Sequence, residues 1–299
     1  MRDRAAMSRA CDGIDTVFHT AADISLLGGT AVTEEYRRPV YETNVGGVEN
    51  TLEACRERGV TRLVYTSSVD VCFNGVSIEK MNQATPYAPS PRSVYAETKI
   101  EAEKRVLEAN GKDGLLTCSV RCDAIYGPGE NLMLDALVTQ LAYNRLKLLL
   151  GSATTLQDNS CVDNLVYGEL LAAQHLIPGG NACGKAYFIT DDEPQNTFDF
   201  MRPLIEGLGY KVPRGRLPRG LLFPILKAWE YLHFRIGLPA PPIGPHEIDK
   251  VTVTHYGSIE DARRDLGYEP IKSADEALRE CIPYCRDLLE KIRQERKSR

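Results

Sequence analysis

The sequence predicts an α/β fold built on a doubly wound parallel sheet, followed by a smaller C-terminal substrate-binding lobe. Short β-prone apolar runs alternate with helical segments through the first half of the chain, as in proteins whose parallel strands are joined by helical crossovers. Ligands bind beyond the carboxyl ends of such strands, where this chain has small or polar residues: Ala21/Ala22, Ser67/Ser68 and Tyr126/Gly127. After about residue 150 Gly, Pro and Arg accumulate, so we expect one domain over 1–150 and a second over 151–299.

The composition restricts the class of protein. The chain has 299 residues, of which 43% are hydrophobic and 26% charged, as in soluble globular proteins with a sizeable core. Its 36 Lys and Arg against 41 Asp and Glu leave a net charge of −5, so nothing in the overall charge favours nucleic acid. Nine cysteines without a C-x-x-C pair indicate reduced thiols and a cytoplasmic protein. We therefore expect neither a disulfide framework nor a membrane-spanning segment.

The elements of the first domain are predicted in chain order. A short helix over residues 1–12 precedes a strand at 16–19. Apolar residues recur at helical spacing over 34–58, and Gly59 ends this predicted helix as a C-cap. The remaining expected elements are a strand at 63–68, a loop at 74–93, a helix at 94–109 and a strand at 115–120.

The second lobe is predicted from weaker signals. We expect a short strand and a helix within 159–173, and another strand at 186–189. Apolar residues then recur at helical spacing over 221–238, interrupted by charged ones. This segment is too polar to span a membrane. It predicts either a helix packed on the lobe or an amphipathic element that lines an apolar pocket or contacts a membrane surface.

Candidate catalytic residues come from a Tyr-x-x-x-Lys spacing, which places both side chains on one face of a helix. The ammonium favours the phenolate and lowers a phenol pKa of about 10, so that the Tyr can act as general acid or base for a carbonyl/alcohol pair. The spacing occurs three times, at Tyr95/Lys99, Tyr143/Lys147 and Tyr268/Lys272. Because only the first pair follows a strand that ends in hydroxyls, we expect Tyr95, Lys99 and Ser68 to be catalytic.

Seven ordered motifs carry a resemblance to a known family. Four of them resemble the extended short-chain dehydrogenase/reductase superfamily: V-F-H-T-A-A (17–22), N-V-G-G (44–47), Y-T-S-S (65–68) and Y-A-E-T-K (95–99). Three more resemble its 3β-hydroxysteroid dehydrogenase/isomerase branch: R-C-D-A-I-Y-G-P-G (121–129), N-S-C-V-D-N-L-V-Y-G (159–168) and A-R-R-D-L-G-Y-E-P (262–270). The resemblance covers nearly the whole chain and implies a Rossmann-like fold that binds NAD.

The resemblance also implies roles for individual positions. Tyr95 would exchange the proton of a substrate 3-hydroxyl, and Ser68 would hold the reacting oxygen beside it. Lys99 would lower the pKa of Tyr95 and hydrogen-bond the nicotinamide ribose. The small side chains of Ala21 and Ala22 would let the cofactor pass close to the backbone. Asn44 would either contact the cofactor or cap its helix, and both alternatives stay open.

Two departures from the family pattern concern the cofactor site. Cys122 stands where the family has Pro, and we expect a small buried thiol there. The G-x-x-G-x-x-G turn that holds the pyrophosphate does not precede Val17, and Gly28-Gly29 follows the wrong strand. By resemblance we expect an N-terminally incomplete sheet that lacks about 60 to 70 residues, including the adenosine-binding half. A shortened form that does not bind the cofactor is the alternative.

The resemblance implies an NAD-dependent 3β-hydroxysteroid or sterol dehydrogenase, and it alone implies a Δ5-to-Δ4 isomerase activity. Other open functions are a sterol-4-carboxylate 3-dehydrogenase, a nucleotide-sugar epimerase or dehydratase, and a truncated non-catalytic form. Arg214, Arg216 and Arg219 offer cations for a sugar diphosphate, whereas the apolar segment 221–238 favours a sterol. Use of NADP in place of NAD stays open as an alternative. Whether the protein forms a homodimer also stays open. We expect a cytoplasmic protein with peripheral membrane contact through 221–238. We expect neither a nucleic-acid partner nor a bound metal.

Overall fold

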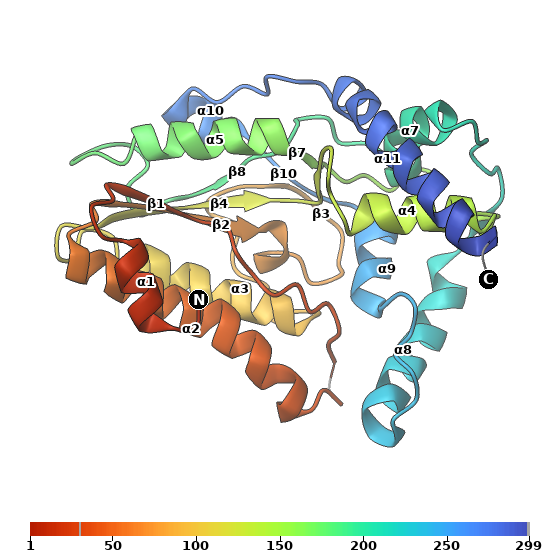
Figure 1. Ribbon diagram of the computed structural model, residues 1–299, viewed down its shortest axis with the longest axis horizontal. Helices are drawn as coiled ribbons and strands as arrows, with labels where there is room; N and C mark the ends of the chain where they lie inside the picture. The colour runs from red at the N-terminus through yellow and green to blue at the C-terminus, as the bar shows by residue number, and fades with distance from the viewer. Residues whose placement is uncertain (30, 298–299) are drawn as a thin grey trace.

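The protein is built on a four-stranded parallel sheet, described by a computed structural model over residues 1–29 and 31–297 (Figure 1). The strands are, in spatial order, β1 (Thr16–His19), β2 (Arg62–Ser68), β4 (Leu116–Cys122) and β8 (Ala186–Phe188). Every neighbouring pair runs parallel, with Leu63 opposite Val17 on one side and opposite Thr117 on the other. The carboxyl ends therefore lie at one edge of the sheet, and the predicted α/β fold is confirmed.

Helices cover both faces of this sheet, as parallel strands require. One face carries α1 (Arg4–Ala10), α2 (Glu34–Arg58) and α3 (Val94–Glu108), and the opposite face carries α5 (Val162–Gln174) and α10 (Glu260–Leu266) (Figure 1). Successive side chains of β2 point to opposite faces. Leu63 and Tyr65 join the buried cluster of α2 and α3, whereas Val64 joins that of α5 and α10.

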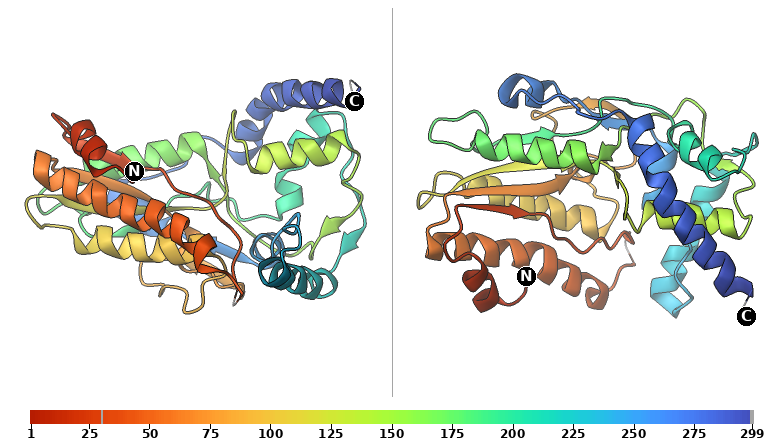
Figure 2. Two further views of the ribbon diagram at one scale, coloured as in Figure 1. Left: turned by 60° about the horizontal axis from the view of Figure 1, so that its bottom comes forward. Right: turned by 45° about the horizontal axis from the view of Figure 1, so that its top comes forward.

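The remaining elements gather mainly beyond the carboxyl ends of the strands, as the two views of Figure 2 show. In chain order they are the 3₁₀ helix η1 (Val69–Val71), β3 (Ile78–Met81), β5 (Ile125–Tyr126), α4 (Met133–Ala142), β6 (Leu149–Leu150), β7 (Ser160–Cys161), α6 (Thr197–Phe200), α7 (Arg202–Gly207), β9 (Arg216–Leu217), α8 (Arg219–Ile236), α9 (Pro245–Thr252), β10 (His255–Gly257) and α11 (Ala274–Lys297). α4, α7 and α11 share one buried cluster around Leu134, Leu204 and Leu278.

The helix predicted over 34–58 is confirmed as α2. Its first turn is capped by the Thr33 hydroxyl, which accepts a hydrogen bond from the Tyr36 N–H at 3.3 Å. It ends at Gly59, whose φ of 70° lies in the left-handed region that glycine adopts at low cost. The signals that bound this helix are local, so they could be recognised in the sequence.

The start of α3 is fixed by the loop that follows β1. The Ser93 hydroxyl accepts a hydrogen bond from the Ala96 N–H at 3.1 Å and so caps the helix. The N–H groups of Val94 and Tyr95 donate to carbonyl oxygens of the loop after β1, at 3.1 and 3.2 Å. N–H groups in a first helical turn have no partner within the helix. The loop therefore satisfies two of them and holds the turn that carries Tyr95.

The loop predicted over 74–93 contains a strand, so that prediction is wrong in part. β3 pairs in parallel with β10, which lies far along the chain, and no local pattern could show this pairing. The main sheet also takes its fourth strand, β8, from beyond residue 150. The division into domains 1–150 and 151–299 stays a prediction, and the sheet draws on both ranges.

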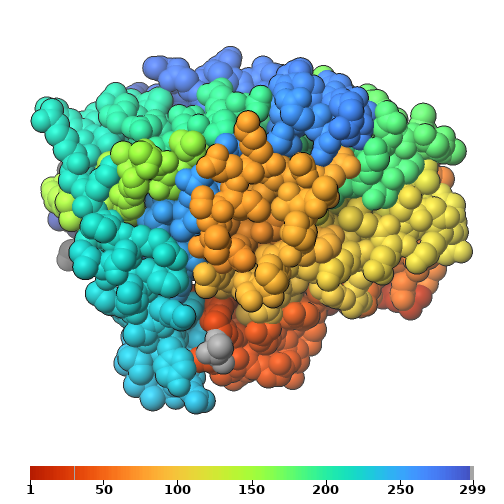
Figure 3. All heavy atoms as spheres, turned by 180° about the vertical axis from the view of Figure 1, so that it is seen from behind, coloured from red at the N-terminus to blue at the C-terminus, as the bar shows by residue number. Residues whose placement is uncertain are grey.

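α8 is the helix predicted over 221–238, and it projects from the body of the molecule at the lower left of Figure 3. Its side chains Leu221, Ile225 and Ile236 are 63, 62 and 68% exposed. Exposed apolar residues that gather on one element, unlike isolated ones, mark interaction sites. Over the described ranges 1–29 and 31–297, no helix combines the length and apolarity needed to cross a membrane.

Candidate active site

Tyr95, Lys99 and Ser68 come together where β2 ends against α3. Tyr95 lies in the first turn of α3 and Lys99 one turn later. The Lys99 ammonium is 5.9 Å from the centre of the Tyr95 ring. It donates a hydrogen bond to the Thr66 carbonyl oxygen at 2.5 Å. Ser68 is the last residue of β2 and is one of the groups that influence the pKa of Tyr95. The three predicted residues are therefore neighbours, while their catalytic roles stay predictions.

Burial, and not Lys99, dominates the ionisation of Tyr95. Removal from water raises the pKa of Tyr95 above its usual 10, and Cys122 and two nearby aspartates raise it further. Ser68 lowers that pKa, but by less than burial raises it. Burial also lowers the pKa of Lys99 to about 8. The ammonium of Lys99 is directed at a backbone carbonyl and is not among the largest influences on the Tyr95 pKa, so its role in lowering that pKa stays a prediction.

Asn44 holds the loop after β1 against α3. It lies well inside α2 and Thr33 caps that helix, so the alternative of a capping Asn44 is wrong. The Asn44 Oδ1 accepts from the Asp23 N–H at 2.7 Å. Its Nδ2 donates to the Asp23 carbonyl oxygen at 3.0 Å and to the Thr98 hydroxyl at 2.9 Å. A contact between Asn44 and the cofactor stays a prediction.

Ala21 and Ala22 lie in this same loop, just beyond the carboxyl end of β1. Ala21 is exposed and Ala22 is half-buried, so neither side chain belongs to the core of the sheet. The next residue, Asp23, is held by Asn44 through both its N–H and its carbonyl oxygen. The loop is therefore anchored directly after the two alanines, at the edge where ligands of parallel sheets bind. The close approach of a cofactor to Ala21 and Ala22 stays a prediction.

The residues of the other two Tyr-x-x-x-Lys pairs lie where exposure or packing contacts, and not catalysis, account for them. Tyr143 lies at the end of α4 and is 37% exposed, so it does not share a helix with Lys147. Tyr268 is buried and donates to the Thr190 carbonyl oxygen at 2.8 Å. Lys272 forms ion pairs with two carboxylates. Neither pair resembles an acid–base site, which supports the choice of the pair on α3.

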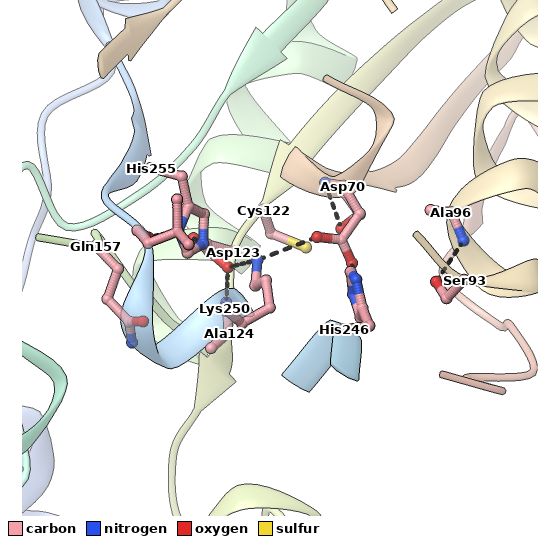
Figure 4. Close-up of polar contacts among 12 residues, drawn as sticks. Asp70, Ser93, Ala96, Cys122, Asp123, Ala124, Gln157, His246, Lys250 and His255 are labelled. Atoms are coloured by element: carbon pink, nitrogen blue, oxygen red, sulfur yellow. Dashed lines mark hydrogen bonds and ion pairs between the residues drawn. The ribbon is translucent and has the colours of Figure 1, made fainter. Parts of the chain in front are cut away.

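A buried group of charged side chains lies just beyond the carboxyl ends of β2 and β4 (Figure 4), and no sequence pattern singled it out. Asp70 follows β2 and Asp123 follows β4, and both are buried. Lys250 of α9 reaches between them, with its Nζ 3.2 Å from Asp70 Oδ1 and 2.5 Å from Asp123 Oδ1. His246 Nε2 lies 3.1 Å from Asp70 Oδ2. His255 Nε2 lies 3.3 Å from Asp123 Oδ2.

Lys250 keeps both of these carboxylates charged. Burial alone would raise the pKa of an aspartate, yet Lys250 and His246 hold the pKa of Asp70 well below its usual range. In the same way Lys250 and His255 lower the pKa of Asp123 against the effect of burial. Two aspartates at strand ends, and a His and a Lys four residues apart on α9, are the signals that could have pointed to this group.

Comparison with known proteins identifies the family. The model of the 3-beta hydroxysteroid dehydrogenase/isomerase family matches residues 1–219. The chain belongs to this family. It is 44% identical over 296 residues to the 3 beta-hydroxysteroid dehydrogenase/Delta 5-to-4-isomerase of Mycobacterium tuberculosis, a match covering 99% of this chain and 80% of the relative. The 3-beta-hydroxysteroid dehydrogenase of Mycolicibacterium neoaurum is 43% identical over 284 residues, covering 95% and 78%.

Solved structures confirm the Rossmann-like fold. UDP-glucuronic acid 4-epimerase from Bacillus cereus in complex with NAD matches with a TM-score of 0.67 and 18% identity, over 97% of this chain and 80% of that one. RMD from Pseudomonas aeruginosa complexed with NADPH matches with a TM-score of 0.68 and 16% identity, over 96% and 86%. At such low identity the likeness concerns the fold alone.

Two positions where the chain departs from the 3-beta hydroxysteroid dehydrogenase/isomerase pattern have packing roles. Cys122 is 6% exposed and its thiol donates to the Ser67 carbonyl oxygen at 3.3 Å, so the predicted buried thiol is confirmed. All nine cysteines are free, also as predicted. A Cβ on Gly28 would lie 2.1 Å from the Arg92 carbonyl oxygen. Gly28 therefore serves a close backbone contact, in line with the prediction that it opens no pyrophosphate turn.

The surroundings of Lys99 fit the ribose and nicotinamide end of a dinucleotide. An ammonium has three N–H donors, and Lys99 directs one of them to Thr66. Within the described part of this family member, no carboxylate lies within ion-pair distance of Lys99. Its other donors are thus suited to ribose hydroxyls. No G-x-x-G-x-x-G turn occurs in the sequence, so the fit concerns this end of the cofactor and not the pyrophosphate.

Proposed function

We propose that the chain is a nicotinamide-dependent 3β-hydroxysteroid or sterol dehydrogenase. The observation that carries the proposal is the meeting of Tyr95, Lys99 and Ser68 at the end of β2 in a member of the 3-beta hydroxysteroid dehydrogenase/isomerase family. A phenol, an ammonium and a hydroxyl in this arrangement suit proton exchange with a secondary alcohol. Two mycobacterial relatives carry this activity in their names.

In the proposed reaction each of these residues handles a proton or an oxygen atom. Ser68 donates a hydrogen bond to the oxygen on C3 of the substrate and holds it beside Tyr95. The phenolate of Tyr95 takes the proton of the C3 hydroxyl as hydride leaves C3. The nicotinamide, when bound, supplies the hydride acceptor. Because burial opposes the phenolate, the positive charge of Lys99 is needed nearby, and its free N–H donors hold ribose hydroxyls.

We propose NAD as the cofactor, with NADP as the alternative. Structures with the same fold hold either cofactor, since one contains NAD and another NADPH. Titration of the chain with NADH and separately with NADPH, followed by fluorescence and by thermal unfolding, measures the preference. Saturable binding with a raised unfolding midpoint supports a cofactor site. A folded chain that binds neither cofactor would contradict the proposal and leave the truncated, non-catalytic form.

A steroid or sterol substrate is supported over a nucleotide sugar by two observations. α8 offers exposed apolar side chains, of which Ile225 is 62% exposed. Two of the cations that could hold a sugar diphosphate are engaged within the chain, because Arg219 binds Asp249 at 2.5 Å and Arg216 donates to the Ser152 carbonyl oxygen at 3.2 Å. A sterol-4-carboxylate substrate is the alternative within this class of reaction. A Δ5-to-Δ4 isomerase activity is part of the proposal and is supported by the name of the Mycobacterium tuberculosis relative.

We propose further that the protein is cytoplasmic and contacts a membrane surface through 221–238. The apolar side chains of α8 are accompanied by Lys227 and Arg235, a combination typical of helices that lie in a membrane interface. A membrane would also be the source of an insoluble sterol. A homodimer stays a prediction that gel filtration tests.

The activity itself is tested by following NADH absorbance with NAD and a 3β-hydroxy-5-ene steroid. Steady formation of NADH and the 3-ketosteroid supports the proposal. Binding of NADH without any steroid turnover, combined with conversion of a nucleotide sugar, would replace the steroid dehydrogenase by the epimerase alternative. The Lys99→Met variant should lose both turnover and NADH affinity, and unchanged NADH binding would argue against a ribose contact by Lys99.

A further inference from the structure

Glu230 is a buried carboxyl residue on a helix that is otherwise largely exposed. Among the residues of α8, all of which the structure describes, only Leu226 and Glu230 are buried, and their spacing of four places them on one face. A buried carboxyl group costs free energy unless it is hydrogen-bonded. The Glu230 Oε1 accepts a hydrogen bond from the Gly28 N–H at 3.1 Å, across 202 residues of sequence. Glu230 therefore joins α8 to the loop after β1.

Gly28 also lies directly against the residues that start α3. A Cβ on Gly28 would lie 2.1 Å from the Arg92 carbonyl oxygen and 2.9 Å from the Ser93 Cα, so a larger residue would push the two backbones apart. The Ser93 hydroxyl caps α3 by its hydrogen bond with the Ala96 N–H (Figure 4). The residue that Glu230 holds is thus in close contact with the N-terminus of α3.

One peptide group passes the hold of Glu230 on to the first turn of α3. The N–H of Gly28 and the carbonyl of Leu27 belong to the same peptide group, and that carbonyl oxygen accepts from the Val94 N–H at 3.1 Å. A peptide group is planar, so its N–H and C=O cannot turn independently. The Ser25 carbonyl oxygen of the same loop accepts from the Tyr95 N–H at 3.2 Å. Fixing the Gly28 N–H therefore fixes an acceptor of this turn.

We infer that Glu230 is a positioning residue, which holds the peptide group between Leu27 and Gly28 and through it the turn of α3 that carries Tyr95. The inference rests on the proposed function, in which Tyr95 must lie beside the reacting oxygen. Misplacement of a reacting group by about 1 Å can cost about a hundredfold in rate. Glu230 lies outside every motif that carries the family resemblance, so this task is additional to the Tyr-x-x-x-Lys spacing.

A purely structural Glu230 would only fasten α8 to the rest of the protein. Other contacts already do this, because the Phe234 ring packs against Tyr36 with centroids 5.3 Å apart and Arg219 binds Asp249 at 2.5 Å. Loss of a fastening contact lowers stability and leaves the kcat of the folded molecules unchanged. Loss of a positioning contact lowers the kcat of fully folded protein and loosens the first turn of α3.

Three replacements of Glu230 separate these explanations. Glu230→Gln keeps an oxygen that can accept from the Gly28 N–H, so its kcat for a 3β-hydroxysteroid should stay near that of the unaltered chain. Glu230→Asp withdraws the carboxyl group by one methylene and Glu230→Ala removes it, and both should lose about tenfold or more in kcat. NADH affinity should stay nearly unchanged in all three, because Asn44 holds residues 21–23 separately.

Amide hydrogen exchange of the segment with Val94 and Tyr95 gives a readout that does not depend on turnover. Exchange there should be faster in Glu230→Ala and Glu230→Asp than in Glu230→Gln or the unaltered chain. Asp261→Ala is the matched control, because Asp261 Oδ2 accepts from the Gln83 N–H at 3.1 Å and so joins α10 to the loop after β3. This control should keep both its kcat and the exchange at Val94 and Tyr95.

The outcomes separate the inference from the proposed function. An unchanged kcat or an unchanged exchange in folded Glu230→Ala and Glu230→Asp overturns the inference. An equal loss of kcat in Glu230→Gln and Glu230→Ala also overturns it, because the hydrogen bond to Gly28 would then not matter. If Glu230→Ala does not fold, the comparison of Glu230→Asp with Glu230→Gln decides. Absence of steroid turnover in the unaltered chain contradicts the proposed function instead, while the exchange still decides whether Glu230 holds this turn.

Discussion

Lys99 costs the folded protein stability at neutral pH, so the Lys99→Met variant should be more stable even though we expect it to lose activity. The Lys99 side chain is 2% exposed and donates a hydrogen bond to the Thr66 carbonyl oxygen. Burial lowers its pKa from 10.5 to about 8. This difference corresponds to about 3 kcal/mol by which the folded state disfavours the charged form. A methionine of similar length carries no charge and avoids this cost.

The pH dependence follows from proton binding. Below pH 8 Lys99 is protonated in both the folded and the unfolded chain, so the full cost applies. Between pH 8 and 10.5 the unfolded chain keeps a proton that the folded chain has released, so this group makes stability rise with pH. In the variant, loss of the hydrogen bond to Thr66 cancels about 1 to 2 kcal/mol of the stability gained by removing the buried charge. Lys99→Met should therefore be more stable by about 1 to 2 kcal/mol at pH 7, and less stable above the unfolded-state pKa.

Urea unfolding of both proteins at pH 7 and pH 10.5 measures this difference. Lys112→Met is the control, because Lys112 is exposed and its replacement should change stability equally at the two pH values. A Lys99→Met variant that is less stable at pH 7, or whose difference from the unaltered chain does not depend on pH, would refute the reasoning about Lys99.

Three other predictions concern stability, cofactor and membrane. Glu103→Gln should cost about 3 kcal/mol in urea unfolding, because Arg121, 2.7 Å away and 4% exposed, loses its buried counter-charge; a loss below 1 kcal/mol would contradict this. Asn44→Ala should weaken NADH binding about tenfold, because the loop at 21–23 loses its anchor, and unchanged affinity would separate Asn44 from the cofactor site. Ile225→Asp should reduce flotation with sterol-containing vesicles about tenfold, and equal flotation would exclude α8 as the contact.

The elements that could be predicted from the sequence are those with local signals. The extent of α2 follows from a helical apolar period that ends at Gly59, and β1 was predicted at Thr16–His19. Tyr95 and Ser68 could be chosen as site residues because a helix and a strand end each place them by short-range geometry. The choice among the three Tyr-x-x-x-Lys pairs also depended on a local feature, the hydroxyl residues that end the strand before Tyr95.

The contacts that escaped prediction join distant parts of the chain. β3 pairs with β10, and Lys250 binds Asp70 across 180 residues of sequence. The direction of the pKa shift of Tyr95 could not be predicted either. Spacing on a helix shows that Lys99 is near Tyr95, but burial and the aim of the ammonium at Thr66 are tertiary properties. These contacts also form the buried group that sets the electrostatics of the site.

The central claim is that Tyr95 carries the proton in a steroid dehydrogenase reaction. The most direct test compares steroid turnover and NADH affinity of Tyr95→Phe with those of Tyr143→Phe, the matched replacement in a second Tyr-x-x-x-Lys pair. Tyr95→Phe should lose about a thousandfold or more in turnover with NADH affinity nearly unchanged, and Tyr143→Phe should remain as active as the unaltered chain. Near-normal turnover in Tyr95→Phe, or an equal loss in Tyr143→Phe, would contradict the assignment of Tyr95.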